Sequence, residues 1–138
     1  MRALNTIKLG SSYWNNNLIS NSYRDEFRIS NNFEERYHEC KTIRGKYPDR
    51  IPVICQKHNA STIESIQKTK FLVPQDLTAT QFLFIIRKKL KLPSEKGVFL
   101  FVNNMLATSS ETILSLYESH RDPDGFLYMF YTDENIFG

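Results

Sequence analysis

The sequence predicts an α+β fold with the element order of a β-grasp domain. Two strand-like segments, 50–57 and 70–74, precede an apolar helix at 81–90. Two more strand-like segments, 98–102 and 126–131, follow that helix. A helix in this position packs across one face of the mixed sheet that the strands form. The chain of 138 residues has the size of one ordinary domain. We expect a four-stranded mixed sheet, a central packed helix and an extra N-terminal helix or helices.

The first 32 residues differ from the rest of the chain in composition. Asn and Ser fill 12 of these 32 positions, and the apolar residues show no sustained period. We interpret residues 1–32 as a mostly flexible extension with one short helical turn near 23–29. The first acidic residue is Asp25, so the opening stretch weakly resembles a transit peptide, although a plain extension is the preferred interpretation. The folded domain is placed at 33–138.

An apolar face at helical spacing predicts the first helix of the domain, beginning at Phe33. Asn31 and Asn32 are suitable N-cap residues, and two glutamates follow in the first turn. Gly45 and Pro48 are expected to end the helix. The predicted buried face consists of Phe33, Tyr37, Cys40 and Ile43, which are spaced i, i+4, i+7 and i+10.

The first two predicted strands, 50–57 and 70–74, carry apolar residues on both sides. Thr78 is expected to cap the helix at 81–90, which is apolar almost all round and holds more apolar residues than one core face needs. Lysine and arginine gather at its end, where they suit the negative end of the helix dipole. Pro93 follows.

The C-terminal half reads as short strands joined by turns. Asn103-Asn104 is a tight-turn signal between the strand at 98–102 and Met105. A short helix is predicted at 113–119. The turn Asp122-Pro123-Asp124-Gly125 then leads into the last strand, and the chain ends in a polar tail.

Charge is unevenly distributed along the chain. Residues 36–91 carry twelve Lys or Arg against four Asp or Glu, whereas residues 92–138 carry two against seven. A basic face would suit an acidic peptide, an anionic lipid or nucleic acid, and an ordinary solvated surface would give the same composition. Nucleic acid is the weakest of these uses, because the basic residues are not interleaved with exposed aromatics in a recognisable binding module.

Composition excludes several classes of protein. With 41% hydrophobic residues the chain can build a core, so wholesale disorder is excluded. No apolar stretch approaches a membrane span, and the N-terminus lacks the apolar run of a secretory signal peptide. The two cysteines cannot form a disulfide framework or a zinc cluster. We expect a reduced, intracellular protein without a metal or cofactor.

Catalytic chemistry has no positive support in the sequence. The three histidines are scattered, the carboxylates are dispersed, and the five glycines are isolated rather than grouped in a phosphate-binding loop. Cys40 and Cys55 are best interpreted as small core thiols, although a Cys–His pair is not excluded by sequence. We therefore predict no catalytic residues and no enzyme.

Binding features carry more information. Pro52 and Pro74 cannot donate to a strand ladder, which suggests strands with incompletely paired edges. An edge strand that is apolar on both faces can receive an extended peptide by β-augmentation. The segment 70–73 is the candidate, with Phe71 and Val73 facing one side and Leu72 the other. A short core strand covered by helices is the alternative interpretation, and the residues alone do not decide between them.

Several segments together resemble a known family. They are Lys46-Tyr47-Pro48-Asp49-Arg50-Ile51-Pro52-Val53-Ile54, Lys70-Phe71-Leu72-Val73-Pro74, Phe101-Val102-Asn103-Asn104, Asp124-Gly125-Phe126-Leu127-Tyr128 and the terminal Phe137-Gly138. They are similar to the autophagy ubiquitin-like modifiers: autophagy-related protein 8, the GABA-A-receptor-associated protein and microtubule-associated protein light chain three. The resemblance covers 33–138.

The resemblance implies a ubiquitin-like fold and a lipid-conjugated modifier. Gly138 would be activated and joined to phosphatidylethanolamine by activating and conjugating enzymes, and a cysteine protease would remove the lipid. The protein would be a monomer, cytoplasmic before conjugation and bound to an autophagosome or another vesicle or organelle membrane after it. A non-covalent β-grasp scaffold in vesicle traffic or microtubule association is the alternative.

The resemblance also implies a docking groove for cargo receptors that carry an aromatic-x-x-aliphatic motif. The implied aromatic pocket consists of Glu39, Ile43, Pro52, Ile54, Lys70, Leu72 and Phe126. The implied aliphatic pocket consists of Phe71, Val73, Pro74, Leu77, Phe82 and Ile85. Acidic residues beside the motif would meet Arg50, Lys68 and Lys89.

Overall fold

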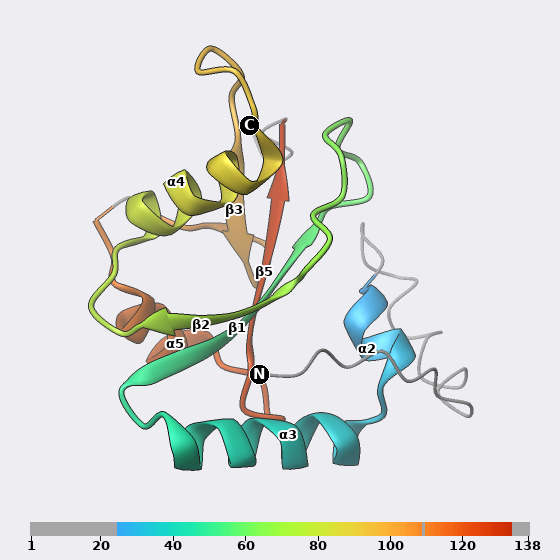
Figure 1. The fold of residues 1–138 in the computed structure, drawn as a ribbon, viewed down its shortest axis with the longest axis vertical. Helices are drawn as coiled ribbons and strands as arrows, with labels where there is room; N and C mark the ends of the chain where they lie inside the picture. The colour runs from blue at the N-terminus through green and yellow to red at the C-terminus, as the bar shows by residue number, and fades with distance from the viewer. Residues whose placement is uncertain (1–24, 109, 134–138) are drawn as a thin grey trace.

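The computed structural model confirms the α+β class and describes residues 25–108 and 110–133 (Figure 1). The helices and strands follow the predicted order, and the short helical turn expected near 23–29 is present as α2. They are α2 (Glu26–Ser30), α3 (Phe33–Lys46), β1 (Arg50–Lys57), β2 (Lys70–Pro74), α4 (Ala79–Leu90), β3 (Phe99–Val102), β4 (Met105–Leu106), α5 (Ile113–His120) and β5 (Leu127–Thr132).

The strands form one mixed sheet in the order β2-β1-β5-β3-β4. β1 and β5 are parallel, and the other neighbouring pairs are antiparallel. The sheet has five strands rather than the predicted four, because the segment after the Asn103-Asn104 turn pairs with β3 as a two-residue strand. Both asparagines have positive φ, 49° and 62°, which is the left-handed conformation that a tight hairpin turn requires. β2 and β4 are the two edge strands.

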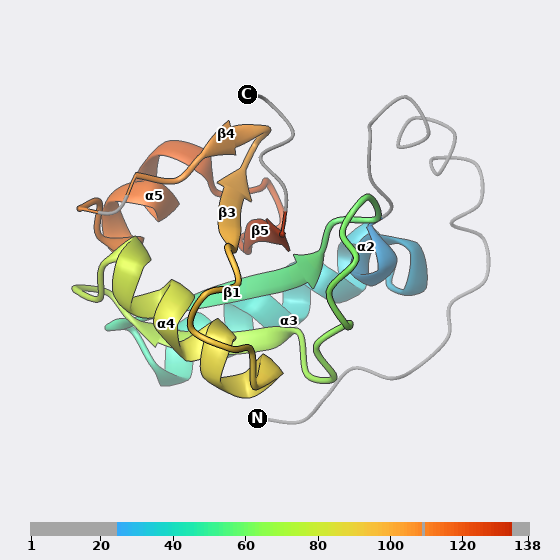
Figure 2. The same ribbon diagram turned by 90° about the horizontal axis from the view of Figure 1, so that it is seen from above.

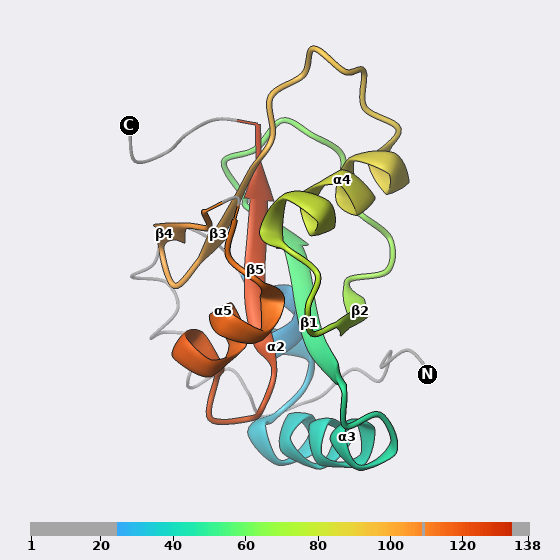
Figure 3. The same ribbon diagram turned by 90° about the vertical axis from the view of Figure 1, so that its left-hand side faces the viewer.

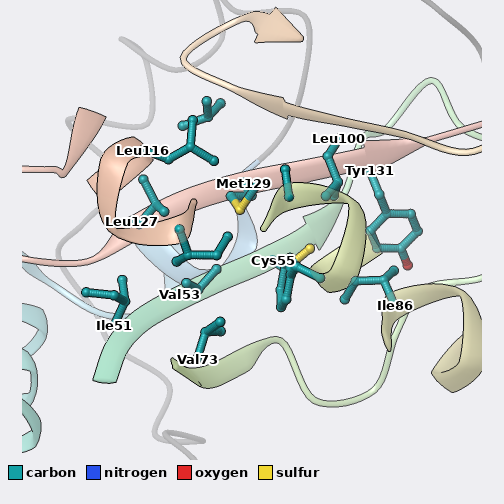
Figure 4. Close-up of a cluster of buried hydrophobic side chains, with 14 of the residues drawn as sticks. Ile51, Val53, Cys55, Val73, Ile86, Leu100, Leu116, Leu127, Met129 and Tyr131 are labelled. Atoms are coloured by element: carbon teal, nitrogen blue, oxygen red, sulfur yellow. The ribbon is translucent and has the colours of Figure 1, made fainter. Parts of the chain in front are cut away.

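One face of the sheet, which we call the α4/α5 face, holds the main core. Side chains from the strands, from α4 and from α5 point toward one another there (Figure 4). Figure 3 shows α4 and α5 beside the strands and α3 apart from both. The central buried residues are Ile51, Val53, Cys55, Val73, Phe82, Ile86, Leu100, Leu116, Leu127, Met129 and Tyr131. The predicted central helix is therefore confirmed as part of this core.

The opposite face, which we call the α2/α3 face, carries a smaller core. α3 lies on the other side of β1 and β2 from α4 (Figure 1), and α2 lies next to the carboxyl end of β1 (Figure 2). The buried apolar residues of this cluster are Phe27, Cys40, Ile43, Ile54, Phe126 and Tyr128, with Leu72 packed against them. Apolar residues on both sides of β1 are thereby explained, because each side faces its own cluster.

The predicted buried face of the first helix is partly wrong. Cys40 and Ile43 are buried, but Phe33 and Tyr37 are 45% and 41% exposed and stack on each other with ring centroids 5.9 Å apart. Arg36 takes the buried position in that part of α3, where its guanidinium finds acceptors. The helix also continues through Gly45 to Lys46.

The packed domain begins before the predicted boundary at residue 33. α2 falls within the stretch assigned to the extension, and Phe27 is 7% exposed in the smaller core. Asp25 caps this helix by accepting a hydrogen bond from the backbone N–H of Arg28. Residues 1–24 of the predicted flexible extension lie outside the described residues.

Candidate functional site

The candidate site is built on β2, an edge strand of the sheet. β2 pairs on one side with β1 in antiparallel register, which places Pro52 opposite Leu72 and Ile54 opposite Lys70. Its other side has no strand partner in the described sheet. The strand is also apolar on both faces, and these two properties are what a strand-adding peptide requires.

The residues of the implied aromatic pocket gather on the α2/α3 face. Glu39 and Ile43 come from α3, Phe126 directly precedes β5, and the others come from β1 and β2. Three of the seven, Ile43, Ile54 and Phe126, belong to the smaller core, and Leu72 packs against it. Two of these, Ile54 and Phe126, are fully buried. The resemblance therefore selected residues that the fold brings together, with Leu72 and Lys70 half-buried at the edge of the set.

An ion pair lies at the outer side of the residues of the implied aromatic pocket. The ammonium group of Lys70 on β2 binds the carboxylate of Glu39 on α3. The two side chains are only 9% and 15% exposed. The pair joins the edge strand to α3 over the smaller core, so that an incoming aromatic side chain would have to pass it.

The implied aliphatic pocket lies on the α4/α5 face. Phe71, Val73, Leu77 and Phe82 belong to or pack against the main core. The rings of Phe71 and Phe82 meet edge-to-face with centroids 5.3 Å apart. Pro74 and Ile85 are exposed. The two implied pockets therefore lie on opposite faces of β2, as alternation along a strand dictates.

The implied basic contacts are all exposed. Arg50 begins β1, Lys68 precedes β2, and Lys89 lies near the end of α4. The side chain of Arg44 donates a hydrogen bond to the backbone oxygen of Arg50, at 2.6 Å, and fixes the start of β1. Gly138, the implied conjugation residue, lies outside the described residues.

A buried polar network beneath the site was not foreseen. Arg36 forms an ion pair with Asp124 at 2.9 Å, and Tyr128 donates a hydrogen bond to the same carboxylate at 2.5 Å. The backbone N–H of Phe126 also donates to it. Burial nevertheless raises the pKa of Asp124 to about 6, against the opposing effect of these hydrogen bonds and of Arg36. The only sequence signal was the turn 122–125, which gave no hint of the partner on α3.

Phe27 is a residue of the site region that sequence reasoning missed. Its ring contacts Phe126 edge-to-face at 5.4 Å, and the ammonium group of Lys70 lies 6.0 Å from its centroid. Its backbone N–H donates to Gln56 on β1 at 2.8 Å. A signal existed in Asp25, an N-cap residue two positions before Phe27. Too few residues follow for a helical period to emerge.

The remaining chemical predictions concern cysteines, metals and membrane spans. Cys40 and Cys55 are both buried, and burial raises the pKa of the Cys40 thiol to about 12. This confirms the interpretation as core thiols, which are protonated at neutral pH. Across residues 25–108 and 110–133, no cluster of three or more His, Cys, Asp or Glu side chains is arranged to hold a metal. In the same part of the chain, none of the helices has the length and apolarity of a membrane span.

A family model and the curated relatives of this chain point to the same protein family. The model of the family described as autophagy protein Atg8, ubiquitin-like, matches residues 35–138. Autophagy-related protein 8 of Pichia angusta is 50% identical over 115 residues, covering 83% of this chain and 92% of that protein. Autophagy-related protein 8e of Arabidopsis thaliana is 51% identical over 112 residues, covering 81% and 92%.

A solved structure agrees with this assignment. The crystal structure of ATG8 from Trypanosoma brucei superposes with a TM-score of 0.76 at 38% identity. The match covers 78% of this chain and 93% of that one. The family model matches most of this chain, and each relative aligns over more than four fifths of this chain and of its own length. The solved structure has the same fold. This chain therefore belongs to the autophagy-related protein 8 family of ubiquitin-like proteins.

Proposed function

We propose that this protein is a lipid-conjugated modifier of autophagy that also serves as a docking adaptor for aromatic-x-x-aliphatic peptides. Family membership supports the modifier role and a general place in the autophagy conjugation system. The observation that carries the adaptor role is β2, an edge strand flanked by one apolar cluster on each face. The protein supplies a carboxyl group and a docking surface, and the partner enzymes perform the bond-making steps.

Conjugation would proceed through the terminal carboxylate of Gly138. The carboxylate attacks ATP to form an acyl-adenylate and releases pyrophosphate, and a thiol of the activating enzyme then displaces AMP. The resulting thioester passes to a thiol of the conjugating enzyme. The amine of phosphatidylethanolamine attacks the thioester carbonyl, forms an amide and releases the thiol. A cysteine protease would later hydrolyse that amide.

Docking would add the peptide to the outer side of β2. Backbone hydrogen bonds supply affinity that does not depend on sequence, and side chains on alternate sides of the peptide supply specificity. The aromatic side chain would enter the α2/α3 face, and the aliphatic side chain would enter between β2 and α4. Exposed Arg50 and Lys68 would attract acidic residues beside the motif.

Lipid conjugation is tested directly by reconstitution. The full chain is incubated with activating and conjugating enzymes of the family, ATP and liposomes containing phosphatidylethanolamine, and the product is read by mass spectrometry. We expect a phosphatidylethanolamine adduct on Gly138 and none on the Gly138→Ala variant. If no adduct forms while the enzymes modify another family member, the modifier role is overturned in favour of a non-covalent scaffold.

Docking is tested by calorimetry with an aromatic-x-x-aliphatic peptide that carries acidic flanking residues. We expect binding of micromolar strength that weakens as salt rises. The double substitution Lys70→Ala/Leu72→Ala should weaken binding about tenfold or more, which is about 1.4 kcal/mol or more. Met105→Ala/Leu106→Ala, on the exposed opposite edge strand, is the matched control and should leave affinity unchanged. Equal affinity in both variants would exclude β2 as the docking edge.

Location follows from the same proposal. Before conjugation the protein would be cytoplasmic and monomeric, and afterwards it would be held on an autophagosome or another vesicle membrane by the lipid. Cargo receptors would then gather at that membrane through β2. Because docking at β2 does not require Gly138, a Gly138→Ala protein that still reached membranes in cells would favour the scaffold role in vesicle traffic or microtubule association.

A further inference from the structure

The end of β5 is fastened to the loop that joins β1 to β2, residues 58–69. The backbone N–H of His58 donates to the backbone oxygen of Tyr131 at 2.9 Å. The hydroxyl of Tyr131 donates to the backbone oxygen of Glu64 at 2.7 Å and accepts from the backbone N–H of Ile66 at 2.8 Å. These contacts continue past the end of β1, so the loop accompanies β5 to its last residues.

Asp133, the residue that follows β5, is bound by the same loop. Its carboxylate accepts from the hydroxyl of Ser61 at 3.1 Å and from the backbone N–H of Thr62 at 3.2 Å. The hydroxyl of Thr62 donates to this carboxylate as well. In return, the backbone N–H of Asp133 donates to the hydroxyl oxygen of Ser61 at 3.3 Å. Both the backbone and the side chain of Asp133 are therefore held in place.

A second loop supplies a cation to the same carboxylate. Lys96 lies between α4 and β3, and its ammonium nitrogen is 3.2 Å from a carboxylate oxygen of Asp133. Figure 1 shows the two loops on either side of the tip of β5. The side chain of Asp133 is only 6% exposed in this arrangement. We call Ser61, Thr62, Lys96 and Asp133 the tail clamp.

The tail clamp stands where the chain leaves the domain toward Gly138. Five residues lead from Asp133 to Gly138, and five residues span at most about 17 Å. The clamp therefore fixes the point from which the terminal carboxylate is presented. Neither Thr62 nor Asp133 belongs to the main core or the smaller core, so packing of the domain gives no reason for these contacts.

We propose that the tail clamp positions the C-terminal tail for capture by the activating and conjugating enzymes. This inference rests on the proposed conjugation of Gly138 and adds the residues that determine how readily the enzymes capture it. An enzyme that binds the tail must order its backbone, and a residue that is already ordered does not lose that conformational entropy again. Because the cost falls on binding and not on bond-making, loss of the clamp raises KM for this protein and leaves kcat unchanged.

ATP–pyrophosphate exchange by the activating enzyme, with the concentration of the full chain varied, tests the clamp. Asp133→Ala should raise KM about fivefold, as expected when one more residue must be ordered on binding, and Thr62→Ala should raise it by a smaller factor. Thr62→Ser keeps the hydroxyl and should match the unaltered chain. Thr42→Ala is the matched control, because it removes an exposed threonine hydroxyl from α3. Urea unfolding verifies that each variant is folded.

A double variant separates the clamp from direct contact with the enzyme. Thr62→Ala/Asp133→Ala should have a KM no higher than that of Asp133→Ala alone, because both substitutions break the same contact. Effects that multiply would mean that each side chain touches the enzyme independently, and would overturn the clamp. Unchanged KM in both single variants would overturn it as well, as would a fall in kcat with KM unchanged.

Hydrogen exchange gives a readout that needs no enzyme. The backbone N–H of Asp133 should exchange faster in Thr62→Ala than in the unaltered chain, since its acceptor Ser61 stays in place only while the loop is held. Equal exchange would overturn the clamp while leaving conjugation intact. If enzymes that activate another family member do not activate the unaltered chain, the conjugation role is overturned and this inference with it.

Discussion

The two faces of the sheet are stabilised in different ways. Among the described residues, eighteen buried residues form the main core on the α4/α5 face, whereas six buried apolar residues form the smaller core on the α2/α3 face. The second face adds buried polar groups, among them Asp25, Arg36, Gln56 and Asp124. Apolar burial is non-directional and insensitive to pH, while a buried ion pair depends on geometry and on protonation.

This difference teaches where the molecule can change. A face held by apolar burial opens only when much of the domain unfolds, whereas a face held by a few directional contacts can open locally when a partner offers equivalent contacts. The comparison can be tested by disrupting each face in turn.

The largest effect is expected from a cavity in the main core. Phe82→Ala removes a side chain that is 1% exposed and packs edge-to-face on Phe71, and should lower the free energy of unfolding by about 3–5 kcal/mol. Phe84→Ala, two residues later in α4, removes a ring that is 60% exposed and should cost less than about 1 kcal/mol. Urea unfolding followed by circular dichroism measures both. Similar losses for the two variants would show that α4 does not carry the main core.

A smaller loss is expected when the polar network loses its cation. Arg36→Ala leaves the buried carboxylate of Asp124 without its ion-pair partner and should cost about 3 kcal/mol. The double variant Arg36→Met/Asp124→Asn removes both charges and should recover part of that loss, because an unpaired buried charge no longer remains. Urea unfolding near pH 7 gives the comparison. A double variant less stable than Arg36→Ala would contradict this account.

The pH dependence of stability should differ in sign between two carboxylates. The pKa of Asp124 is about 6 in the folded protein against an ordinary 3.8, so the folded state holds the proton more tightly between these values. Asp124 therefore stabilises the fold most at low pH, and its contribution should fall by about 2 kcal/mol as pH rises from 4 to 6. Asp124→Asn should remove this decline in a series of urea unfolding curves.

Asp133 provides the opposite sign at the end of β5. Hydrogen bonds, first from the Thr62 side chain and then from the Thr62 backbone, Lys96 and Ser61, lower its pKa below the ordinary value despite some burial. Its stabilisation is present above about pH 4 and is lost as pH falls below that value. Asp133→Asn should therefore flatten the acid side of the curve and leave the region from pH 4 to 6 unchanged. A loss of slope in that region instead would assign the Asp124 effect to the wrong residue.

The sequence was a good guide to the apolar face and a poor one to the polar face. Short runs that are apolar on both sides identified 50–57 and 70–74, because most residues of these strands face one of the two cores. The polar network escaped prediction because its partners are far apart in sequence: 88 residues separate Arg36 from Asp124, and 94 separate Arg28 from Asp122. No period or spacing signals such a pair.

The residues of the candidate site also divide into those that the sequence predicted and those that it did not. Periodicity and resemblance together selected Ile43, Ile54 and Leu72, which do pack in one cluster. Phe27 was missed, because a five-residue helix is too short to show a period and its position is set by Gln56, 29 residues away. Phe33 and Tyr37 were assigned to the core because their spacing fitted a helix, but spacing does not say which face of the helix is covered.

The smallest expected effects concern the first turns of the two main helices, and here the faces should behave alike. Asn32 on α3 and Thr78 on α4 each form a capping box, in which the cap side chain accepts from the third helical N–H and that residue's side chain accepts in return. Asn32→Ala and Thr78→Ala should each lower the free energy of unfolding by about 1 kcal/mol, because capping satisfies backbone groups locally and does not depend on what the helix covers. Equal losses in urea unfolding would confine the difference between the faces to their buried side chains.

A much larger loss for Asn32→Ala would instead mean that the start of α3 is coupled to the neighbouring network through Asn31, whose backbone oxygen accepts from Arg36. In that case the directional contacts of the α2/α3 face would extend into the helix itself.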